Sequence, residues 1–438
     1  MQRYHARDAL LPEGWARDVV IAIDGGDIVS VTTDSRDGEP LAGPVLPGMA
    51  NLHSHAFQRA MAGLTETRAS AEDDFWSWRE LMYRFVERIT PEQAGAIALH
   101  LYIELLRHGY TAVGEFHYVH RPGELLTPHL EAARAAGIAI TLLPSLYRWG
   151  GFGERPLAPR QRRFASEVQT IVGIATRFRP SPDERCGVAP HSLRAVDPAA
   201  LRELVDAVPR EVPIHLHAAE QTREVEECVA ALGRRPVEWL LENFDLGERW
   251  CLVHATHLLP HEIEALARTG AVAGLCPSTE ANLGDGIFPL VAYRAAGGRY
   301  GIGGDSHVSR DPAEELRLLE TSQRLTVRKR NLVVGAATPS VGTTLWREAA
   351  RGGAQALGRR MGALAPGLRA DLVVLDASHP DLEGRDGDAI ANGLVFSGST
   401  GLVRDVMVAG RWVVRERRHA AEEAAVARYK QAVKALLA

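Results

Sequence analysis

The stretch that decides the fold is VLPGMANLHSH, residues 45–55, because it joins two different kinds of sequence. Before it, apolar and polar side chains alternate, and Asp24-Gly25-Gly26-Asp27 has the composition of a hairpin turn. After it, short apolar runs alternate with amphipathic helical patterns. The stretch itself is mostly apolar and ends in two histidines, so we interpret it as the first strand of a buried sheet.

Seven further apolar runs follow, most of them separated by a helical pattern. With residues 45–55 they make eight candidate strands, the others being residues 111–117, 138–146, 186–192, 212–220, 250–258, 271–279 and 299–307. Eight alternating units predict an α/β fold, a (β/α)8 TIM barrel. A doubly wound open sheet is the structural alternative, but no GxGxxG follows the first strand, which argues against a dinucleotide-binding fold.

Strand-like sequence also occupies the C-terminal region. Residues 364–418 include two alternating runs with glycine turns, and residues 420–438 have the period of an amphipathic helix. Each β-rich end is short for a core of its own, so one joint β-sandwich is favoured over two separate small sheets. We therefore predict a composite sandwich with a C-terminal helix from residues 1–46 and 362–438, and a catalytic barrel from residues 47–361.

The composition limits the class of protein. A chain of 438 residues with 46% hydrophobic residues can form a large barrel and a smaller module. The net charge of −5 argues against nucleic acid or an anionic membrane as a partner. No apolar run has membrane-spanning length and the N-terminal sequence lacks an apolar signal region, so we expect a cytoplasmic protein. The four cysteines form no CxxC pair and are predicted to be reduced, mostly buried thiols: Cys186, Cys228, Cys251 and Cys276.

Histidines and carboxylates stand at the C-terminal ends of the predicted strands, which form the catalytic face of such a barrel. His53 and His55 are two residues apart, so both side chains point the same way and can reach one metal ion. His217 ends the fifth strand, and Glu220 follows three residues later, where a carboxylate can move protons without binding the metal. His215 shares the face of His217 but lies deeper in the strand, in a position typical of a core histidine, so His217 is favoured as the ligand because site residues of such barrels lie at strand ends.

Two further residues extend this set. His254 ends the sixth strand and suits a role beside the metal ligands. Asp305 ends the eighth strand, where it can bind a metal or accept a proton, although an aspartate after Gly-Gly can also simply cap a helix. Each feature alone has an ordinary structural explanation, but their combination on strands one, five, six and eight is specific.

This combination resembles the amidohydrolase superfamily, and the resemblance covers nearly all of the chain, including PGLRADLVVLD in the predicted sandwich. Binuclear members use a bridging carboxylated lysine on the fourth strand, but the lysines here, Lys329, Lys430 and Lys434, all follow the eighth strand. The resemblance therefore implies a mononuclear deaminase site with four ligands: His53, His55, His217 and Asp305. Such nitrogen and oxygen ligands suit one Zn²⁺ per chain, and the residue types also suit Fe²⁺.

Five other stretches resemble the formimidoylglutamate deiminases of bacterial histidine breakdown: NLHSHAFQRAMAGL, DDFWSWRELMY, EFHYVH, APHSLRAV and CPSTEANLGDG. This resemblance implies that a metal-activated water hydrolyses N-formimidoyl-L-glutamate to N-formyl-L-glutamate and ammonia. The catalytic residues it implies are Glu220, His254 and Asp305. It also implies a homodimer.

The same resemblance implies five substrate-binding residues: Gln58, Arg79, Tyr118, His191 and Arg194. A guanidinium fork can bind a carboxylate through two hydrogen bonds, so Arg79 and Arg194 suit a small dicarboxylate substrate. The ordinary alternatives are a surface charge on a helix for Arg79 and a loop salt bridge for Arg194.

Three rival functions remain open on the sequence. Another mononuclear deaminase of the superfamily, acting on a nucleobase or an adenosyl compound, would need aromatic stacking in place of two arginines. A non-catalytic metal-binding protein on the same barrel would have no need of Glu220 and His254. Hydrolysis of the other C–N bond would give formamide and glutamate, and only the resemblance argues against it.

Overall fold

The computed structural model describes residues 1–67, 75–119, 126–336, 338–398 and 401–438. Its centre is made of two parallel sheets with the strand orders β10-β8-β7-β6, with β9 beside β8, and β11-β12-β13-β14. The strands are β6 (Met49–Ser54), β7 (Tyr110–His117), β8 (Ala139–Leu146), β9 (Glu184–Cys186), β10 (Ala189–Pro190), β11 (Ile214–Ala218), β12 (Trp250–His254), β13 (Val272–Leu275) and β14 (Arg299–Ile302). Every predicted strand region of the barrel therefore contains a strand.

Single bridge pairs join the two sheets into a barrel. Val188 pairs with Ile214 and Ser192 with His217, which connects the fourth strand to the fifth. On the other side Ser54 pairs with Asp305, and the Asp305 amide donates a hydrogen bond of 3.0 Å to the His53 carbonyl. The predicted (β/α)8 architecture is confirmed, and both connections involve residues of the predicted metal site.

Glycine is required where the last strand meets the first. A Cβ atom on Gly303 would lie 2.9 Å from Cβ of His53, and one on Gly304 would lie 2.4 Å from Nδ1 of His307. Atoms do not approach so closely without displacement, so the Gly-Gly pair lets the turn before Asp305 pass directly against β6. The close approach brings Asp305 beside the two histidines of the first strand.

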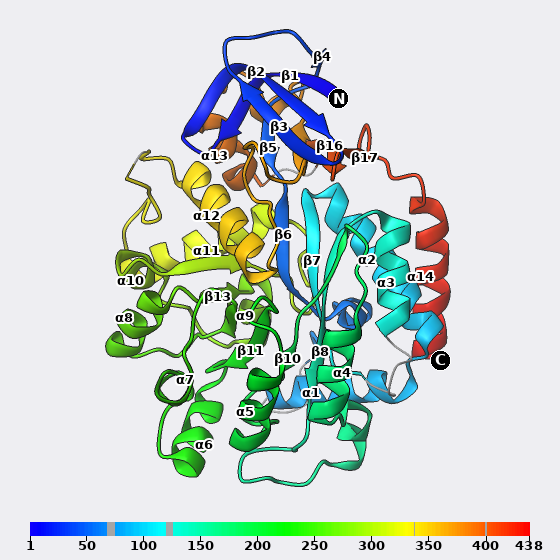
Figure 1. The fold of residues 1–438 in the computed structure, drawn as a ribbon, viewed down its shortest axis with the longest axis vertical. Coiled ribbons are helices and arrows are strands. Elements are labelled where there is room, and N and C mark those ends of the chain that lie inside the picture. Colours follow the sequence, from blue (N-terminus) through cyan, green and yellow to red (C-terminus); the bar gives the residue numbers. More distant parts are fainter. Residues whose placement is uncertain (68–74, 120–125, 337, 399–400) are drawn as a thin grey trace.

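Helices surround the barrel (Figure 1). They are α1 (Phe75–Arg88), α2 (Pro91–Arg107), α3 (Leu126–Ala136), α4 (Val168–Arg177), α5 (Pro198–Ala207), α6 (Thr222–Leu232), α7 (Pro236–Asn243), α8 (Pro260–Thr269), α9 (Pro277–Leu283), α10 (Leu290–Ala295), α11 (Pro312–Val327) and α12 (Val341–Ala356). The sequence sets their starts: Thr90 and Gln93 form a capping box around Pro91, the first residue of α2. No helix in these described ranges is long and apolar enough to cross a membrane.

The two ends of the chain share one further sheet, as the sequence predicts. Its order is β17-β16-β15-β5-β1-β2-β3, with β4 beside β1. The strands are β1 (Gln2–Leu11), β2 (Gly14–Asp24), β3 (Asp27–Thr32), β4 (Glu39–Pro40), β5 (Val45–Pro47), β15 (Leu372–Leu375), β16 (Val403–Val408) and β17 (Arg411–Val414). The predicted hairpin turn is present, with φ of 58° at Gly25 and 92° at Gly26.

This sheet folds over onto itself. Tyr4 of β1 and Trp412 of β17 have ring centroids only 5.5 Å apart, although three strands lie between them in the sheet order. Adjacent strands are roughly 4.8 Å apart, so a flat sheet would separate these rings much further. Apolar side chains fill the space between the two layers, which confirms one joint sandwich. The domain limits at residues 46 and 362 stay a prediction.

Two helices complete the C-terminal region, α13 (Asp388–Phe396) and α14 (Glu422–Leu437). The helix α14, predicted from its periodicity, lies along the barrel helix α2 (Figure 1), with the Tyr429 and His100 rings 4.4 Å apart and Glu422 paired with Arg107 at 3.0 Å. The C-terminal helix therefore covers the barrel, although its sequence follows the sandwich strands.

All four cysteines are buried and form no disulfide, as predicted.

Candidate active site

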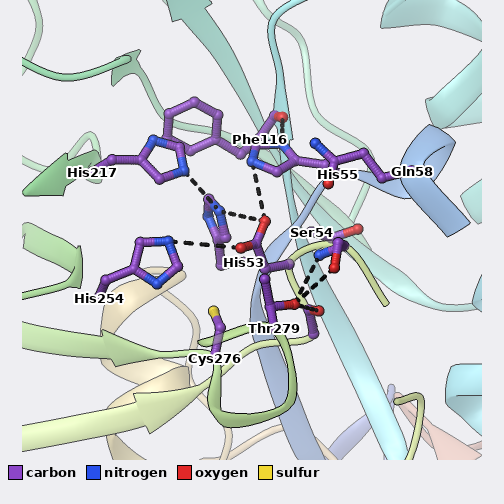
Figure 2. A network of polar contacts seen from close by, with 12 residues as sticks. His53, Ser54, His55, Gln58, Phe116, His217, His254, Cys276 and Thr279 are labelled. Carbon is purple, nitrogen blue, oxygen red and sulfur yellow. Dashed lines mark hydrogen bonds and ion pairs between the residues drawn. The ribbon is translucent and has the colours of Figure 1, made fainter. Parts of the chain in front are cut away.

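Three histidine side chains converge at the C-terminal end of the barrel (Figure 2). His53 lies on β6, His55 follows directly after β6, and His217 lies on β11; their candidate ligand atoms lie within 4.8 Å of one another. The Nε2 atoms of His53 and His217 are 3.1 Å apart. Asp305 adds a carboxylate oxygen, Oδ1, at 3.6 Å from Nε2 of His53 and 3.4 Å from Nε2 of His55. The four predicted ligands are thus brought together, and all are buried.

The backbone orients two of these rings. His55 Nδ1 donates to the Phe116 carbonyl at 2.7 Å, and His217 Nδ1 donates to the His191 carbonyl at 3.0 Å. These hydrogen bonds fix the tautomer that leaves Nε2 as a free electron-pair donor. Burial lowers the pKa of His53 and of His217 well below the ordinary value, which keeps both rings neutral, as metal binding requires. The residues present therefore fit a divalent metal ion.

A buried carboxylate supports the turn that carries the first two predicted ligands. Glu115 on β7 accepts hydrogen bonds from the Ser54 hydroxyl at 2.7 Å, the Ala56 amide at 3.0 Å and the Tyr102 hydroxyl at 3.0 Å. Ser54 lies between His53 and His55 in the sequence. Glu115 consequently fixes the backbone on both sides of the second ligand.

His254 lies among three carboxylates. Its Nδ1 is 3.2 Å from Glu280 Oε1, and its Nε2 is 3.6 Å from Asp305 Oδ2 and 3.7 Å from Glu220 Oε1. Burial alone would lower the pKa of His254, but the charges of Glu220, Asp305 and Glu280 outweigh it and raise this pKa to about 10. The imidazole is therefore placed to hold a proton between Glu220 and the four predicted ligands His53, His55, His217 and Asp305, which together are called the metal cluster.

Glu220 is a buried carboxyl with a defined environment. Its amide donates to Glu224 Oε2 at 3.0 Å, and its Oε2 accepts from Arg194 Nη2 at 3.3 Å. Burial raises the pKa of Glu220 above the ordinary value. A raised pKa makes a carboxyl a better proton carrier than an ordinary exposed carboxylate. Arg194 is therefore in an ion pair, as its ordinary alternative supposed, but its partner Glu220 is a buried residue of the predicted site.

Several strand ends adopt a backbone conformation that is uncommon for residues other than glycine. The φ angles are 50° at Ala219, 66° at His254, 48° at Ala255 and 48° at Asp305. Such conformations cost roughly 1–3 kcal/mol each and cluster at functional sites. The strain accompanies sharp turns that begin where the site residues leave the barrel strands.

A cavity opens from the metal cluster. It is bounded at one end by His55, His217, Glu220 and Asp305. All five predicted substrate residues line it: Gln58, Arg79, Tyr118, His191 and Arg194. Its remaining wall is largely aromatic or apolar and consists of Phe75, Trp78, Met82, Tyr83, Tyr147, Phe164 and Leu283. Gln58 donates to the Tyr118 hydroxyl at 2.7 Å, so these two predicted residues act as one polar unit.

One predicted alternative lies outside the site, and two residues of the site were not predicted. His215 points into the barrel core, where its Nε2 is 2.8 Å from the Ala356 carbonyl. Sequence reasoning missed Glu280, although it lies in the CPSTEANLGDG stretch, because its partner His254 comes from another strand. It also missed Glu224, for which the spacing of four residues from Glu220 was the available signal. Three residues of the quoted family stretches, Asp73, Asp74 and His120, lie outside the described residues.

The site and fold define an amidohydrolase. Residues 45–413 match the model of the Amidohydrolase family, so the chain belongs to this family and is a hydrolytic enzyme. Residues 1–39 match the model described as Formimidoylglutamate deiminase HutF, N-terminal domain. A formimidoylglutamate deiminase of Pseudomonas aeruginosa is 52% identical, with 100% of each chain covered. An 8-oxoguanine deaminase of the same organism is 30% identical over 90% of this chain and 88% of its own.

Solved structures agree with this family. The crystal structure of an amidohydrolase from Brucella melitensis has a TM-score of 0.94 and 44% sequence identity, and each chain is fully covered. The atrazine chlorohydrolase TrzN from Arthrobacter aurescens TC1, solved in complex with zinc, has a TM-score of 0.84 and 24% identity over 99% of this chain and 100% of its own. The latter likeness concerns the fold. Family membership and the clustered histidines together support a metal cofactor.

Proposed function

We propose that this protein hydrolyses N-formimidoyl-L-glutamate to N-formyl-L-glutamate and ammonia in the breakdown of histidine. The observation that carries the proposal is the cavity, which combines a metal cluster at one end with the guanidinium groups of Arg79 and Arg194 along its wall. The relative with 52% identity is a formimidoylglutamate deiminase, which supports the same substrate for this chain.

The proposed cofactor is one Zn²⁺ per chain, with Fe²⁺ as the other ion that these residue types suit. The proposed ligands are His53, His55, His217 and Asp305. A divalent ion held there would supply Lewis-acid chemistry that lowers the pKa of water to about 7 and so makes a nucleophile available at neutral pH.

The protein residues then manage the protons. Asp305 accepts a proton from the attacking water. His254, whose Nε2 lies 3.6 Å from Oδ2 of Asp305, stabilises the negative charge that develops on the attacking oxygen. Glu220 carries a proton to the departing nitrogen, a general acid–base role that contributes typically ~10²–10⁴-fold. A C–O bond forms at the formimidoyl carbon and its C–N bond to the terminal nitrogen breaks, so water and amidine become amide and ammonia.

The remaining proposed roles concern the substrate's ends. Arg79 and Arg194 bind the two carboxylates, since a guanidinium matches a carboxylate in geometry and charge. Gln58, Tyr118 and His191 add hydrogen bonds and shape around the formimidoyl group. A nucleobase or adenosyl substrate is the second candidate, because the aromatic wall offers stacking surfaces and a relative with 30% identity is an 8-oxoguanine deaminase.

The deciding experiment measures ammonia release by the metal-loaded protein and identifies the products by mass. N-formimidoyl-L-glutamate should give ammonia and N-formyl-L-glutamate. Formamide and glutamate as products would overturn the assignment of the cleaved bond. Faster deamination of guanine, cytosine or adenosine would overturn the substrate.

Two further statements belong to the proposal. The four buried free thiols suit a reducing compartment, so we propose a cytoplasmic location. The resemblance to the deiminase family supports a homodimer, which sedimentation of the purified protein would test.

A further inference from the structure

Arg79 is held by aromatic rings. Its Cζ atom lies 4.5 Å from the ring centroid of Trp76 and 5.4 Å from that of Tyr83. These residues precede Arg79 by three positions and follow it by four, so all three share one face of α1. Among the described residues, no carboxylate pairs with the Arg79 guanidinium. Its Nε is buried and without a hydrogen-bond partner there.

This arrangement leaves the donors of Arg79 available. A cation–π contact holds a guanidinium through the faces of aromatic rings and uses none of its N–H groups. Arg194 differs, because its Nη2 contacts Glu220 at 3.3 Å and its Nε lies 3.9 Å from Glu224. Arg79 therefore offers all the N–H donors of its guanidinium to a ligand in the cavity, provided that the rings keep it in place.

Trp76 contacts two further cations: the Cζ atom of Arg194 lies 6.0 Å from the Trp76 ring centroid, and that of Arg223 lies closer. The Cζ atom of Arg223 is also 4.5 Å from the Trp76 ring, and Arg223 is itself fixed by an ion pair with Glu227 at 2.9 Å. Arg223 is the second residue of α6, which follows directly after the turn that carries Glu220. Trp76 thus connects the helix that bears Arg79 with the catalytic turn. Its ring lines an adjoining outer cavity and not the cavity that borders the metal cluster.

We propose that Trp76 is a positioning residue for the substrate: it holds the guanidinium of Arg79 at the distance from Arg194 that a dicarboxylate requires. The ring acts through Arg79 and does not touch the reacting atoms. This inference rests on the proposed function, since it needs a substrate with two carboxylates.

The test compares Trp76→Leu with Trp76→Phe, using N-formimidoyl-L-glutamate as substrate. One cation–π contact is worth roughly 3- to 30-fold in an equilibrium constant. Trp76→Leu should raise KM about 10-fold and leave kcat within about twofold, because the lost contact affects binding and not chemistry. Trp76→Phe keeps an aromatic face and should stay within about threefold of the native KM. Metal content should be normal in both variants.

Two controls separate positioning from general structural damage. Trp412→Leu removes a similar contact in the terminal sheet, where Arg415 Cζ lies 4.6 Å from the Trp412 ring, and it should leave KM unchanged. In an Arg79→Met background, Trp76→Leu should add a much smaller increase in KM, since the closer guanidinium is gone and only that of Arg194, 6.0 Å from the ring, remains. If the leucine variant is unstable, Trp76→Gln suits this partly exposed position and gives the same comparison.

An unchanged KM in both Trp76→Leu and Trp76→Gln, with normal wild-type turnover, would overturn the positioning role alone. An equal increase in KM with and without Arg79 would also overturn it. A wild-type protein that releases no ammonia from N-formimidoyl-L-glutamate would instead overturn the proposed function and this role with it.

Discussion

The metal cluster and the arginine wall of the same cavity are held in different ways. The histidines of the cluster lie on strands of the barrel or directly after one, and backbone carbonyls fix the rings of His55 and His217. The arginines stand on α1 and on the segment after β10, and other side chains fix them: rings alone for Arg79, and carboxylates together with more distant rings for Arg194. The comparison suggests that the cluster tolerates few changes, whereas the wall can be altered without loss of the metal.

The largest expected effect is on the cluster. His217→Ala removes a proposed ligand whose ring position is set by the backbone, so both metal and activity should be lost, with turnover lower by more than about 10⁴-fold, the upper range of one acid–base residue. Metal analysis of the purified variant measures this directly. A variant with a full complement of metal would show that His217 is not a ligand.

Glu220 lies between the two regions and should affect chemistry alone. Glu220→Gln should keep the metal and the fold but lower kcat by ~10²–10⁴-fold, because the amide cannot carry the proton. Steady-state kinetics on metal-loaded protein would reveal this. Near-normal turnover with metal bound would mean that Glu220 has a structural role.

The two arginines should give different kinetic signatures. Arg194→Met leaves the buried Glu220 and Glu224 without their counter-charge, so kcat and kcat/KM should both fall. The fall in kcat/KM should correspond to a loss of ~2–5 kcal/mol in the free energy of transition-state binding. Arg194→Lys should not fully restore activity, because an ammonium lacks the planar fork. Arg79→Met should mainly raise KM, since no carboxylate of the described chain depends on it. Identical kinetics for both methionine variants would remove the distinction between the two arginines.

The smallest expected effect is that of changing Glu115, which supports the backbone around His55. Glu115→Gln weakens the hydrogen bonds that hold Ser54 and Ala56, so metal affinity should fall by about 10–100-fold, as is typical when a group supporting a ligand is changed. Competition with a chelator measures the affinity, while kcat per bound metal should remain close to native. Unchanged affinity would show that the strand itself suffices to orient the ligands.

The same contrast explains what could be predicted from the sequence. The strands, the joint sheet of both chain ends and the converging histidines follow from periodicity, strand parity and position at strand ends, all of which are local. The carboxylate beside His254 could not be predicted, because Glu280 belongs to the next βα unit and meets His254 only through the pairing of β12 with β13. The stacking on Arg79 depends on how α1 and α6 pack, which no local pattern specifies.

The single bridge pairs that close the barrel have a mechanical consequence. One half of the barrel supplies His53 and His55, and the other half supplies His217 and Asp305. An ion bound by all four is a cross-link between the halves, placed beside both joins. Because a ligand that binds only the folded form stabilises it, chelation should release the halves from each other before it unfolds either one. Amide hydrogen exchange should then accelerate first at His55, His217 and Asp305, whose amides donate across these joins.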